Sequence, residues 1–482
     1  SCEGVVRIRM MKQDRHQTAL WLNIIVLTLG RSFLDVWPDM VGHSPALVSV
    51  NALIETSLPN GRVLFSLGIC VGALLIMLFP QRAQKHWHSL AGACLLLSLL
   101  STGGYALVAW GGIQVDASAV GSAAFMIGFS YGITQAMLLC ATARIPRFST
   151  IVWLVALSRI LKTVIVEASA AFPPSVQIVL TVASPLIAVV AAMVATKSMD
   201  RQERMPIRSK KFKEFSYTEV LLGMFLIVFA CFCAVARSFS TLGFWGYEHV
   251  IDPGMLWPTL PTMGIFLVLV YIVFARHSEK DIVNRLIVAC IMVLGFIVLV
   301  DSNVLALVGV PSSGTVALRT MIEMFAQYLS WIAAIAVMRT LAMPPLRIMG
   351  IRQFTMSSLS VVILLVMSGS SELGKTIVTV MLYTITVVAL LVIQRKYKEG
   401  MSHPSSGDVL LEERCRLTAE RYRLSPRETE VLALLAQGRS RAFIQEELFL
   451  SDSTVKTHIR NIYQKVGVHN KQDIITLINE CR

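Results

Sequence analysis

The stretch SVQIVLTVASPLIAVVAAMVAT, residues Ser175–Thr196, contains no Asp, Glu, Lys or Arg. About 20 predominantly apolar residues are needed for a helix to cross the hydrocarbon core of a bilayer, and this stretch has that length. A helix satisfies its own backbone hydrogen bonds in lipid, where no water can do so. The stretch therefore predicts a transmembrane helix.

Eleven further apolar runs have the same character. The whole chain of 482 residues is 55% hydrophobic and only 15% charged, whereas a soluble protein carries about 25% charged residues. This composition excludes both a disordered polymer and an ordinary soluble multidomain enzyme. The fold class that it predicts is all-α, with a bundle of twelve membrane-spanning helices at Thr18–Val36, Val63–Phe79, Ser89–Trp110, Ala119–Ala143, Ser149–Ala170, Ser175–Thr196, Tyr217–Ala236, Thr259–Ala275, Leu286–Val300, Thr315–Met338, Phe354–Met367 and Thr376–Ile393.

The charges between these runs alternate along the chain. Cytoplasmic loops of membrane proteins are enriched in Lys and Arg. One set of loops is basic, with Arg7, Arg9, Lys12, Arg15, Arg82, Lys85, Arg144, Arg147, seven bases from Lys197 to Lys213, Arg276, Lys280, Arg285, Arg339, Arg347, Arg352, Arg395, Lys396 and Lys398. The other set holds Asp39, Glu55, Asp116, Glu248, Asp252 and Asp301. We therefore expect a multi-pass protein of the inner (cytoplasmic) membrane with both termini in the cytoplasm.

The membrane domain, residues 18–394, divides into two similar halves. A short cytoplasmic N-terminus (1–17) precedes it, and a basic loop (197–216) separates the halves 18–196 and 217–394. The sequence GRSF at Gly30–Phe33 returns as ARSF at Ala236–Phe239, which suggests a duplication. The arrangement resembles the major facilitator superfamily, and this resemblance implies two six-helix bundles around a central cavity.

Several of the predicted spans contain ionisable residues. Each costs roughly 2.5–3.5 kcal/mol at the centre of a membrane helix, so such residues mark function by default. The candidate ligand-binding residues are Arg31, Asp35, Arg159, Lys162, Glu167, Arg237, Arg319, Glu323 and Gln327. The pairs Arg31/Asp35 and Arg319/Glu323 have i,i+4 spacing, so each pair could instead satisfy itself without any ligand.

The fifth span differs from the others because its bases outnumber its acids. Arg159 and Lys162 share one nearby carboxylate within the helix, that of Glu167. The span therefore leaves basic charge unpaired within itself. We expect a small anionic ligand, such as a carboxylate, near Arg159, Lys162 and Arg319.

The composition changes after the last span. Residues 395–423 begin with the basic stretch Arg395–Lys398 at the membrane exit and continue through Gly400–Asp408, a flexible linker by composition. A charged helix is predicted at Val409–Arg423, and its charges are typical of a solvated face.

Residues 424–482 carry the start and stop signals of four helices. Ser425-Pro426-Arg427-Glu428 is a capping box with Pro at the first helical position. Ser440 and Ser451 are N-caps of the second and third helices, Gly438 and Gly467 end the first and third, and the fourth begins at Lys471. Four short helices with a tight turn between the second and third predict a helix-turn-helix domain.

The residues of this domain are recognisable. LSPRETEVL at Leu424–Leu432, TVKTHIRNI at Thr454–Ile462 and KVGV at Lys465–Val468 closely resemble the LuxR-type (NarL/FixJ or GerE-type) DNA-binding domain of bacterial regulators. The resemblance implies double-stranded DNA as a partner. It also implies a homodimer on DNA that forms through the last helix.

The helical periodicity of the third helix predicts which residues face DNA. At about 100° per residue, Val455, Ile459, Ile462 and Val466 form the core stripe. The predicted DNA-binding residues project elsewhere and are Ser453, Thr454, Lys456, Thr457, Arg460, Asn461, Gln464 and Lys465. Lys456, Thr457 and Arg460 match the family's base-contacting positions, and Arg or Lys suits the O6 and N7 atoms of guanine. Thr454 suits a phosphate contact, and Asn461 suits a bond to the backbone or to phosphate.

Together these features predict a membrane-integrated, one-component transcription regulator in which the bundle senses a small molecule and the tail binds DNA. Two alternatives stay open: a transporter of the major facilitator type with a fused regulatory DNA-binding tail, and a membrane anchor without an effector. The sequence has no Gly-rich phosphate loop, metal-ligand cluster or nucleophile elbow. We therefore expect no enzyme activity, no metal and no cofactor.

Overall fold

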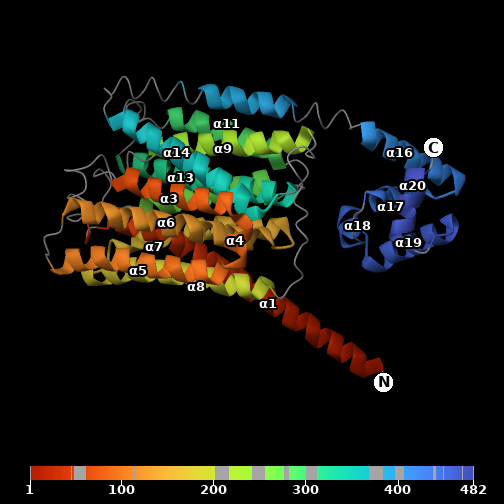
Figure 1. Cartoon of the computed structure of the whole chain (residues 1–482), viewed down its shortest axis with the longest axis horizontal. Helices are drawn as coiled ribbons and strands as arrows, with labels where there is room; N and C mark the ends of the chain where they lie inside the picture. Colours follow the sequence, from red (N-terminus) through yellow and green to blue (C-terminus); the bar gives the residue numbers. More distant parts are fainter. Residues whose placement is uncertain are drawn as a thin grey trace. The chain divides into compact units, whose positions relative to one another are not determined.

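The computed structural model of the chain (Figure 1) is helical, with no strand among the residues that it describes. These residues fall into two compact units, 1–394 and 395–482, called here the membrane unit and the tail unit. The described residues are 2–44, 46–47, 61–111, 116–200, 217–240, 256–275, 282–299, 312–341, 343–368, 381, 384–396, 406–437, 441–448, 450–468 and 470–480.

The first half of the membrane unit follows the predicted order of apolar runs. Each of the first six runs lies within, or nearly within, a helix of its own. These helices are α1 (Cys2–His43), α3 (Gly61–Leu78), α5 (Trp87–Gly111), α6 (Ala117–Ala143), α7 (Phe148–Ser169) and α8 (Pro174–Asp200), with the short α4 (Pro80–Lys85) between α3 and α5.

The second half has the same helical character. Its helices are α9 (Tyr217–Ser240), α10 (Leu256–Val270), which continues as the π-helix η4 (Tyr271–Ala275), α11 (Ile282–Leu299), α13 (Ser312–Thr340) and α14 (Pro345–Ser368). Residues 384–396, within and just after the twelfth predicted run, are also helical.

The lengths and compositions of these helices confirm the membrane class. Among the described residues, six segments are long and apolar enough to cross a bilayer, namely Leu20–Gly42, Trp87–Trp110, Ser118–Ala143, Phe148–Ser169, Pro174–Thr196 and Pro345–Leu365. Shorter apolar helices lie at Val63–Leu78, Glu219–Ala234 and Thr259–Phe274. The total of twelve spans stays a prediction.

The helices of the membrane unit pack against one another both within each half and between the two halves. In the first half α1 packs on α7 and α8, and α3 packs on α6. The halves meet where α14 lies against α3, and where α13 and α10 lie against α7. Helices α3 and α6 cross so closely that position 128 has room only for glycine, because a Cβ on Gly128 would lie 2.0 Å from the carbonyl oxygen of Phe65. Small residues of this kind are typical of membrane helix interfaces.

Several charged positions that were expected in loops lie inside helices instead, among them Asp39, Arg347 and Arg352. Helix α1 continues through Pro38, so Asp39 is helical and only 8% exposed. Helix α14 begins at Pro345, nine residues before the predicted start, and therefore includes Arg347 and Arg352. Arg352 is buried and donates to the hydroxyl of Ser330 on α13, with 3.0 Å between Nε and Oγ. The loop assignments rested on charge alone, and two of these charges find polar partners within the protein, Arg352 at Ser330 and Asp39 at Lys162.

One hydrophobic core is shared by the five helices that the structure describes between residues 406 and 480 of the tail unit. They are α16 (Ser406–Arg421), α17 (Pro426–Ala436), α18 (Arg441–Glu447), α19 (Asp452–Val466) and α20 (Lys471–Glu480). Buried residues of the core are Cys415, Val431, Leu432, Leu435, Ile444, Val455, Ile462, Val466, Ile474 and Ile478.

Helix α16 belongs to this core rather than to a free linker. Cys415 is 2% exposed and Leu411, one turn earlier, packs against the same cluster. The expected division between a linker at 395–423 and a domain at 424–482 therefore cuts through one packed core. The expected solvated face is correct for only one side of α16.

Candidate DNA-reading surface and buried charged layer

Capping residues set the start and end of the helices around the predicted DNA-reading surface. The hydroxyl of Ser425 accepts the backbone N–H of Glu428 at 3.2 Å, and Glu428 Oε2 accepts the backbone N–H of Ser425 at 2.7 Å. The predicted capping box is confirmed. At the start of α19, Ser451 accepts the N–H of Thr454 at 3.2 Å, and Gly467 ends α19 with a left-handed φ of 75°. These caps satisfy backbone groups that a helix end would otherwise leave unpaired.

Helix α19 turns an apolar stripe inward and a polar face outward. Val455, Ile462 and Val466 are buried in the core. The outward face is exposed to solvent and consists of Ser453, Lys456, Thr457, Arg460 and Gln464. Thr454 and Asn461 are half-buried at its margins. The structure therefore presents two cations and three neutral polar side chains on one helical surface, which has the donors and acceptors needed to read base edges.

Lys465 has a second role that the sequence reasoning missed. Its Nζ lies 2.6 Å from Oε2 of Glu428, the carboxylate of the capping box, and so ties α19 to α17. Burial raises the pKa of Glu428, but the Lys465 ammonium and the Ser425 donors outweigh it and hold this pKa below its ordinary value of 4.5. Lys465, which is itself exposed to solvent, thus makes a structural contact with a buried carboxylate, and its predicted DNA contact stays a prediction.

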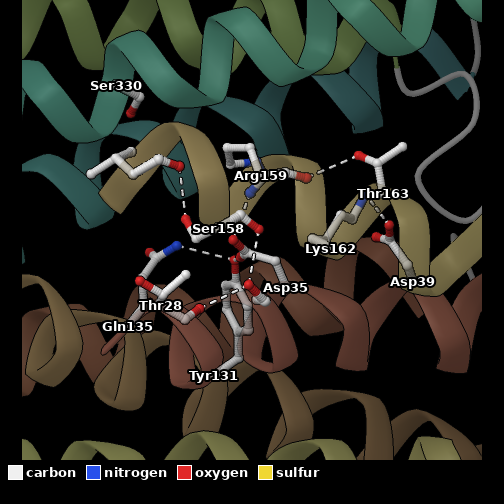
Figure 2. Close-up of polar contacts among 12 residues, drawn as sticks. Thr28, Asp35, Asp39, Tyr131, Gln135, Ser158, Arg159, Lys162, Thr163 and Ser330 are labelled. Atoms are coloured by element: carbon white, nitrogen blue, oxygen red, sulfur yellow. Dashed lines mark hydrogen bonds and ion pairs between the residues drawn. The ribbon is translucent and has the colours of Figure 1, made fainter. Parts of the chain in front are cut away.

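In the membrane unit, two buried ion pairs join α1 to α7, and both can be followed in Figure 2. Arg159 Nη1 lies 2.5 Å from Asp35 Oδ2, with the side chains 1% and 6% exposed. One helical turn further along, Lys162 pairs with Asp39. The basic charge that α7 leaves unpaired within itself, at Arg159 and Lys162, is therefore paired by carboxylates of α1, which the sequence reasoning did not predict. The anionic ligand expected near Arg159, Lys162 and Arg319 stays a prediction.

Hydrogen bonds extend this layer to the other half of the bundle. Tyr131 on α6 donates to Asp35 Oδ1 at 2.8 Å, and Gln135 donates to the Tyr131 oxygen at 3.0 Å (Figure 2). Gln353 on α14 then donates to Gln135 Oε1 at 2.7 Å. A continuous chain of polar contacts thus runs from Arg159 in the first half to Gln353 in the second.

Arg31 has a different environment from Arg159. The alternative in which Arg31 pairs with Asp35 at i,i+4 spacing is not realised, because Asp35 is occupied by Arg159 and Tyr131. Arg31 is completely buried, and its Cζ lies 3.4 Å from the ring centroid of Trp331 on α13. Within the part of the chain that the structure describes, none of its three guanidinium nitrogens has a hydrogen-bond partner.

The remaining candidate ligand residues are placed as follows. Glu167 on α7 and Gln327 on α13 are half-buried, and each has a polar or electrostatic partner. Arg237 lies in α9, and Arg319 and Glu323 lie in α13, but their side chains fall outside the described part of the structure. The contacts expected of these three side chains, including the alternative pair Arg319/Glu323, stay predictions.

Comparison with known families agrees with the geometry of the tail. Residues 422–478 match the family described as bacterial regulatory proteins, luxR family. The chain is therefore a fusion protein, with a LuxR-type DNA-binding domain after a helical membrane unit. This confirms the LuxR-type resemblance of the tail, and the described helices confirm the all-α fold class expected from the sequence.

Three solved membrane transporters are similar in structure to the longer part of the chain. The fucose:proton symporter of E. coli is 11% identical, with 78% of this chain and 99% of that chain covered and a TM-score of 0.46. A bacterial homologue of the iron transporter ferroportin in an outward-facing state is 13% identical, with 80% and 99% covered and a TM-score of 0.46. An autoinhibited peptide transporter of the POT family is 12% identical, with 79% and 97% covered and a TM-score of 0.42.

Proposed function

We propose that this protein is a membrane-integrated, one-component transcription regulator. The observation that carries the proposal is the joining in one chain of a LuxR-type domain with an exposed polar face on α19 and a membrane unit with a buried charged layer. The membrane unit senses a small molecule, and α19 reads a specific DNA sequence. The unit spans the inner membrane with both termini in the cytoplasm, where the tail meets the chromosome.

The polar face of α19 fits the major groove of DNA. Lys456 and Arg460 are separated by four residues, so the two cations lie one above the other on the helix. Arg and Lys donate to guanine O6 and N7, and Thr457 can contact a base edge or a thymine methyl group. Ser453 on this face, and Thr454 and Asn461 at its margins, fit contacts to phosphate, which position the helix without reading sequence.

The charge of the tail supports binding as a homodimer. From Ser425 to Arg482 there are 8 basic and 7 acidic residues, a net charge of 8 − 7 = +1. Because salt-dependent affinity grows with the number of phosphates neutralised, one copy should bind DNA weakly. Two copies joined through α20 would present two reading helices to two half-sites.

The buried layer suits a sensor because it connects the two halves. A ligand controls an equilibrium only by binding one conformation better than another. Asp35, Arg159 and Tyr131 link three helices of the first half, and Gln353 extends the contacts to α14. A change in how the halves meet would alter these bonds, and we propose that it also alters how the tail is presented to DNA.

Genome-wide mapping of bound DNA tests the proposal. Wild type should occupy discrete sites, and the variant Lys456→Ala/Arg460→Ala should lose them while its amount in the membrane stays unchanged. The matched control is Arg416→Ala/Arg421→Ala, which removes the same charge from exposed positions on α16. Discrete sites retained by the α19 variant, or lost equally in the control, would contradict the assignment of the reading face.

One observation also favours a transporter with a regulatory tail. Buried charged residues inside membrane helices are typical of substrate pathways as well as of sensors. Uptake of radiolabelled carboxylates and phosphates into proteoliposomes separates the two functions. A sensor changes the occupancy of its DNA sites without accumulating the solute, whereas a transporter accumulates the solute. Occupancy that no small molecule changes would instead indicate a membrane anchor without an effector.

A further inference from the structure

Arg31 is a buried cation whose donors are not used by the described residues. Nε, Nη1 and Nη2 all lack a hydrogen-bond partner in that part of the chain, although the side chain has no exposure to solvent. The face of Trp331 attracts the cation, but it does not replace hydrogen-bond acceptors for the five guanidinium N–H groups. A buried charge without acceptors is costly, and such groups in membrane helices are normally paired.

The charges around Arg31 favour an anion in particular. Asp35, Arg159 and Arg352 all act electrostatically on Arg31, so among the described residues its charged neighbours are two further arginines and one carboxylate. That carboxylate is already bound by Arg159 and Tyr131. A carboxylate or phosphate group can accept two parallel N–H groups from one guanidinium, which neither water nor a hydroxyl can do with the same charge complementarity.

We infer that Arg31 binds a small free oxyanion, a carboxylate or a phosphate, at the contact between α1 and α13. We infer also that this anion is the class of ligand to which the membrane unit responds, a step that rests on the proposed function. The anion comes from solution and not from a lipid headgroup. Arg31 and Trp331 face the interior of the bundle, whereas Ile25 and Leu29 form the exposed side of α1.

The contact of Arg31 with Trp331 couples this site to the conformation of the bundle. It belongs to α13 in the second half, and Arg31 belongs to α1 in the first half. An anion bound in the plane of the guanidinium neutralises the positive charge that attracts the face of the ring. Binding therefore weakens one contact between the halves, and the ligand favours the conformation in which α1 and α13 are less closely joined.

The test uses the full chain in nanodiscs of phosphatidylcholine, without DNA. The thermal unfolding midpoint of the membrane unit is measured with sodium acetate, benzoate or phosphate, and with sodium chloride at equal ionic strength. At least one oxyanion should raise the midpoint of the wild type more than chloride does, since a ligand that binds the folded state stabilises it. The shift should disappear in Arg31→Gln and persist in Arg82→Gln, an exposed arginine that also lies near an aromatic ring.

Two further variants keep the test decisive if Arg31→Gln does not fold. Arg31→Lys keeps the charge but loses the planar fork, so the affinity for the oxyanion should fall about tenfold or more. Trp331→Leu removes the competing ring, so the affinity should rise, by roughly tenfold. The inference is overturned if no oxyanion exceeds chloride, if the shift survives in Arg31→Gln, or if stabilisation appears only when the nanodiscs contain phosphatidylglycerol.

This experiment separates the inference from the proposed function. The anion shift should be unchanged in Lys456→Ala/Arg460→Ala, because the DNA-reading face takes no part in it. An oxyanion that binds at Arg31 without changing the occupancy of DNA sites would overturn its role as the sensed ligand and leave the site intact. A small molecule that changes occupancy equally in wild type and Arg31→Gln would overturn the site as the sensor and leave the proposed function intact.

Discussion

The two units of this protein contain arginine–carboxylate pairs of nearly the same length in opposite environments. Arg159 and Asp35 lie 2.5 Å apart in the membrane unit, with side chains 1% and 6% exposed. Arg416 and Glu413 lie 2.6 Å apart in the tail unit, with side chains 56% and 50% exposed. The distance alone would rank these pairs as equals. Their surroundings differ, because removing one buried partner leaves a charge that water cannot reach, whereas water solvates either partner of an exposed pair.

The largest effect should follow from Asp35→Asn. The amide keeps the shape of the side chain but leaves Arg159 buried without its counter-ion. Removal of one partner of a buried pair costs about 3–5 kcal/mol, so the unfolding midpoint of the membrane unit should fall strongly. Thermal unfolding in nanodiscs, followed by a probe in the membrane unit, measures the change. A midpoint equal to that of the wild type would show that Asp35 does not stabilise the membrane unit as the counter-ion of Arg159.

An intermediate effect should follow from Glu428→Gln in the tail. The change weakens both the capping box and the bond to Lys465, and a cap of this kind contributes about 1 kcal/mol. Hydrogen–deuterium exchange of α17 and α19 should quicken by an amount that matches this loss. Faster exchange in the membrane unit instead would contradict the local role assigned to Glu428.

The lowered pKa of Glu428 predicts that the stability of the tail unit depends on pH. Burial raises the pKa of Glu428, but the Lys465 and Ser425 donors outweigh this effect, so its pKa in the folded protein lies below 4.5. A lowered pKa means that its contribution is present above pH 4.5 and disappears as the pH falls through the folded-state value. The free energies of unfolding of the tail unit in wild type and in Glu428→Gln should therefore differ at pH 7 and converge at lower pH. A difference that grows with acidity would reverse the assigned sign.

The smallest effect should follow from Glu413→Gln, the exposed counterpart of Asp35→Asn. The pKa of Glu413 is lowered by its hydrogen bond to Arg416, but both side chains are solvated and the pair is screened by salt. The unfolding midpoint of the tail unit should stay unchanged within error at physiological salt. A loss as large as that of Asp35→Asn would remove burial as the explanation of the comparison.

Sequence reasoning predicted the tail better than the membrane unit because the tail signals are local. The capping box at Ser425, the N-cap at Ser451 and the stop at Gly467 each depend on residues within one helical turn. The polar face of α19 follows from helical periodicity in the same way. Helix α16 was underestimated, although Leu411 and Cys415 at i,i+4 spacing already indicate an inward face.

The buried layer could not be predicted because its partners come from different helices. Asp35 and Arg159 are 124 residues apart in the chain, and spacing within one helix gives no information on how two helices are rotated against each other. Arg352 was assigned to a loop from its charge. Proline is common at the first position of a helix, so Pro345 could have indicated the earlier start of α14. Arg31 has no hydrogen-bond partner among the described residues because Asp35 pairs with Arg159, and the sequence gives no sign of that pairing.

A chain that reads DNA while it is held in the membrane must have its tail on the cytoplasmic side. Reporter fusions after Arg482 measure the side directly. A reporter that is active only in the cytoplasm should be active, and one that is active only beyond the inner membrane should be silent. The opposite pattern, with the tail outside the cytoplasm, would contradict DNA binding by this protein in the cell.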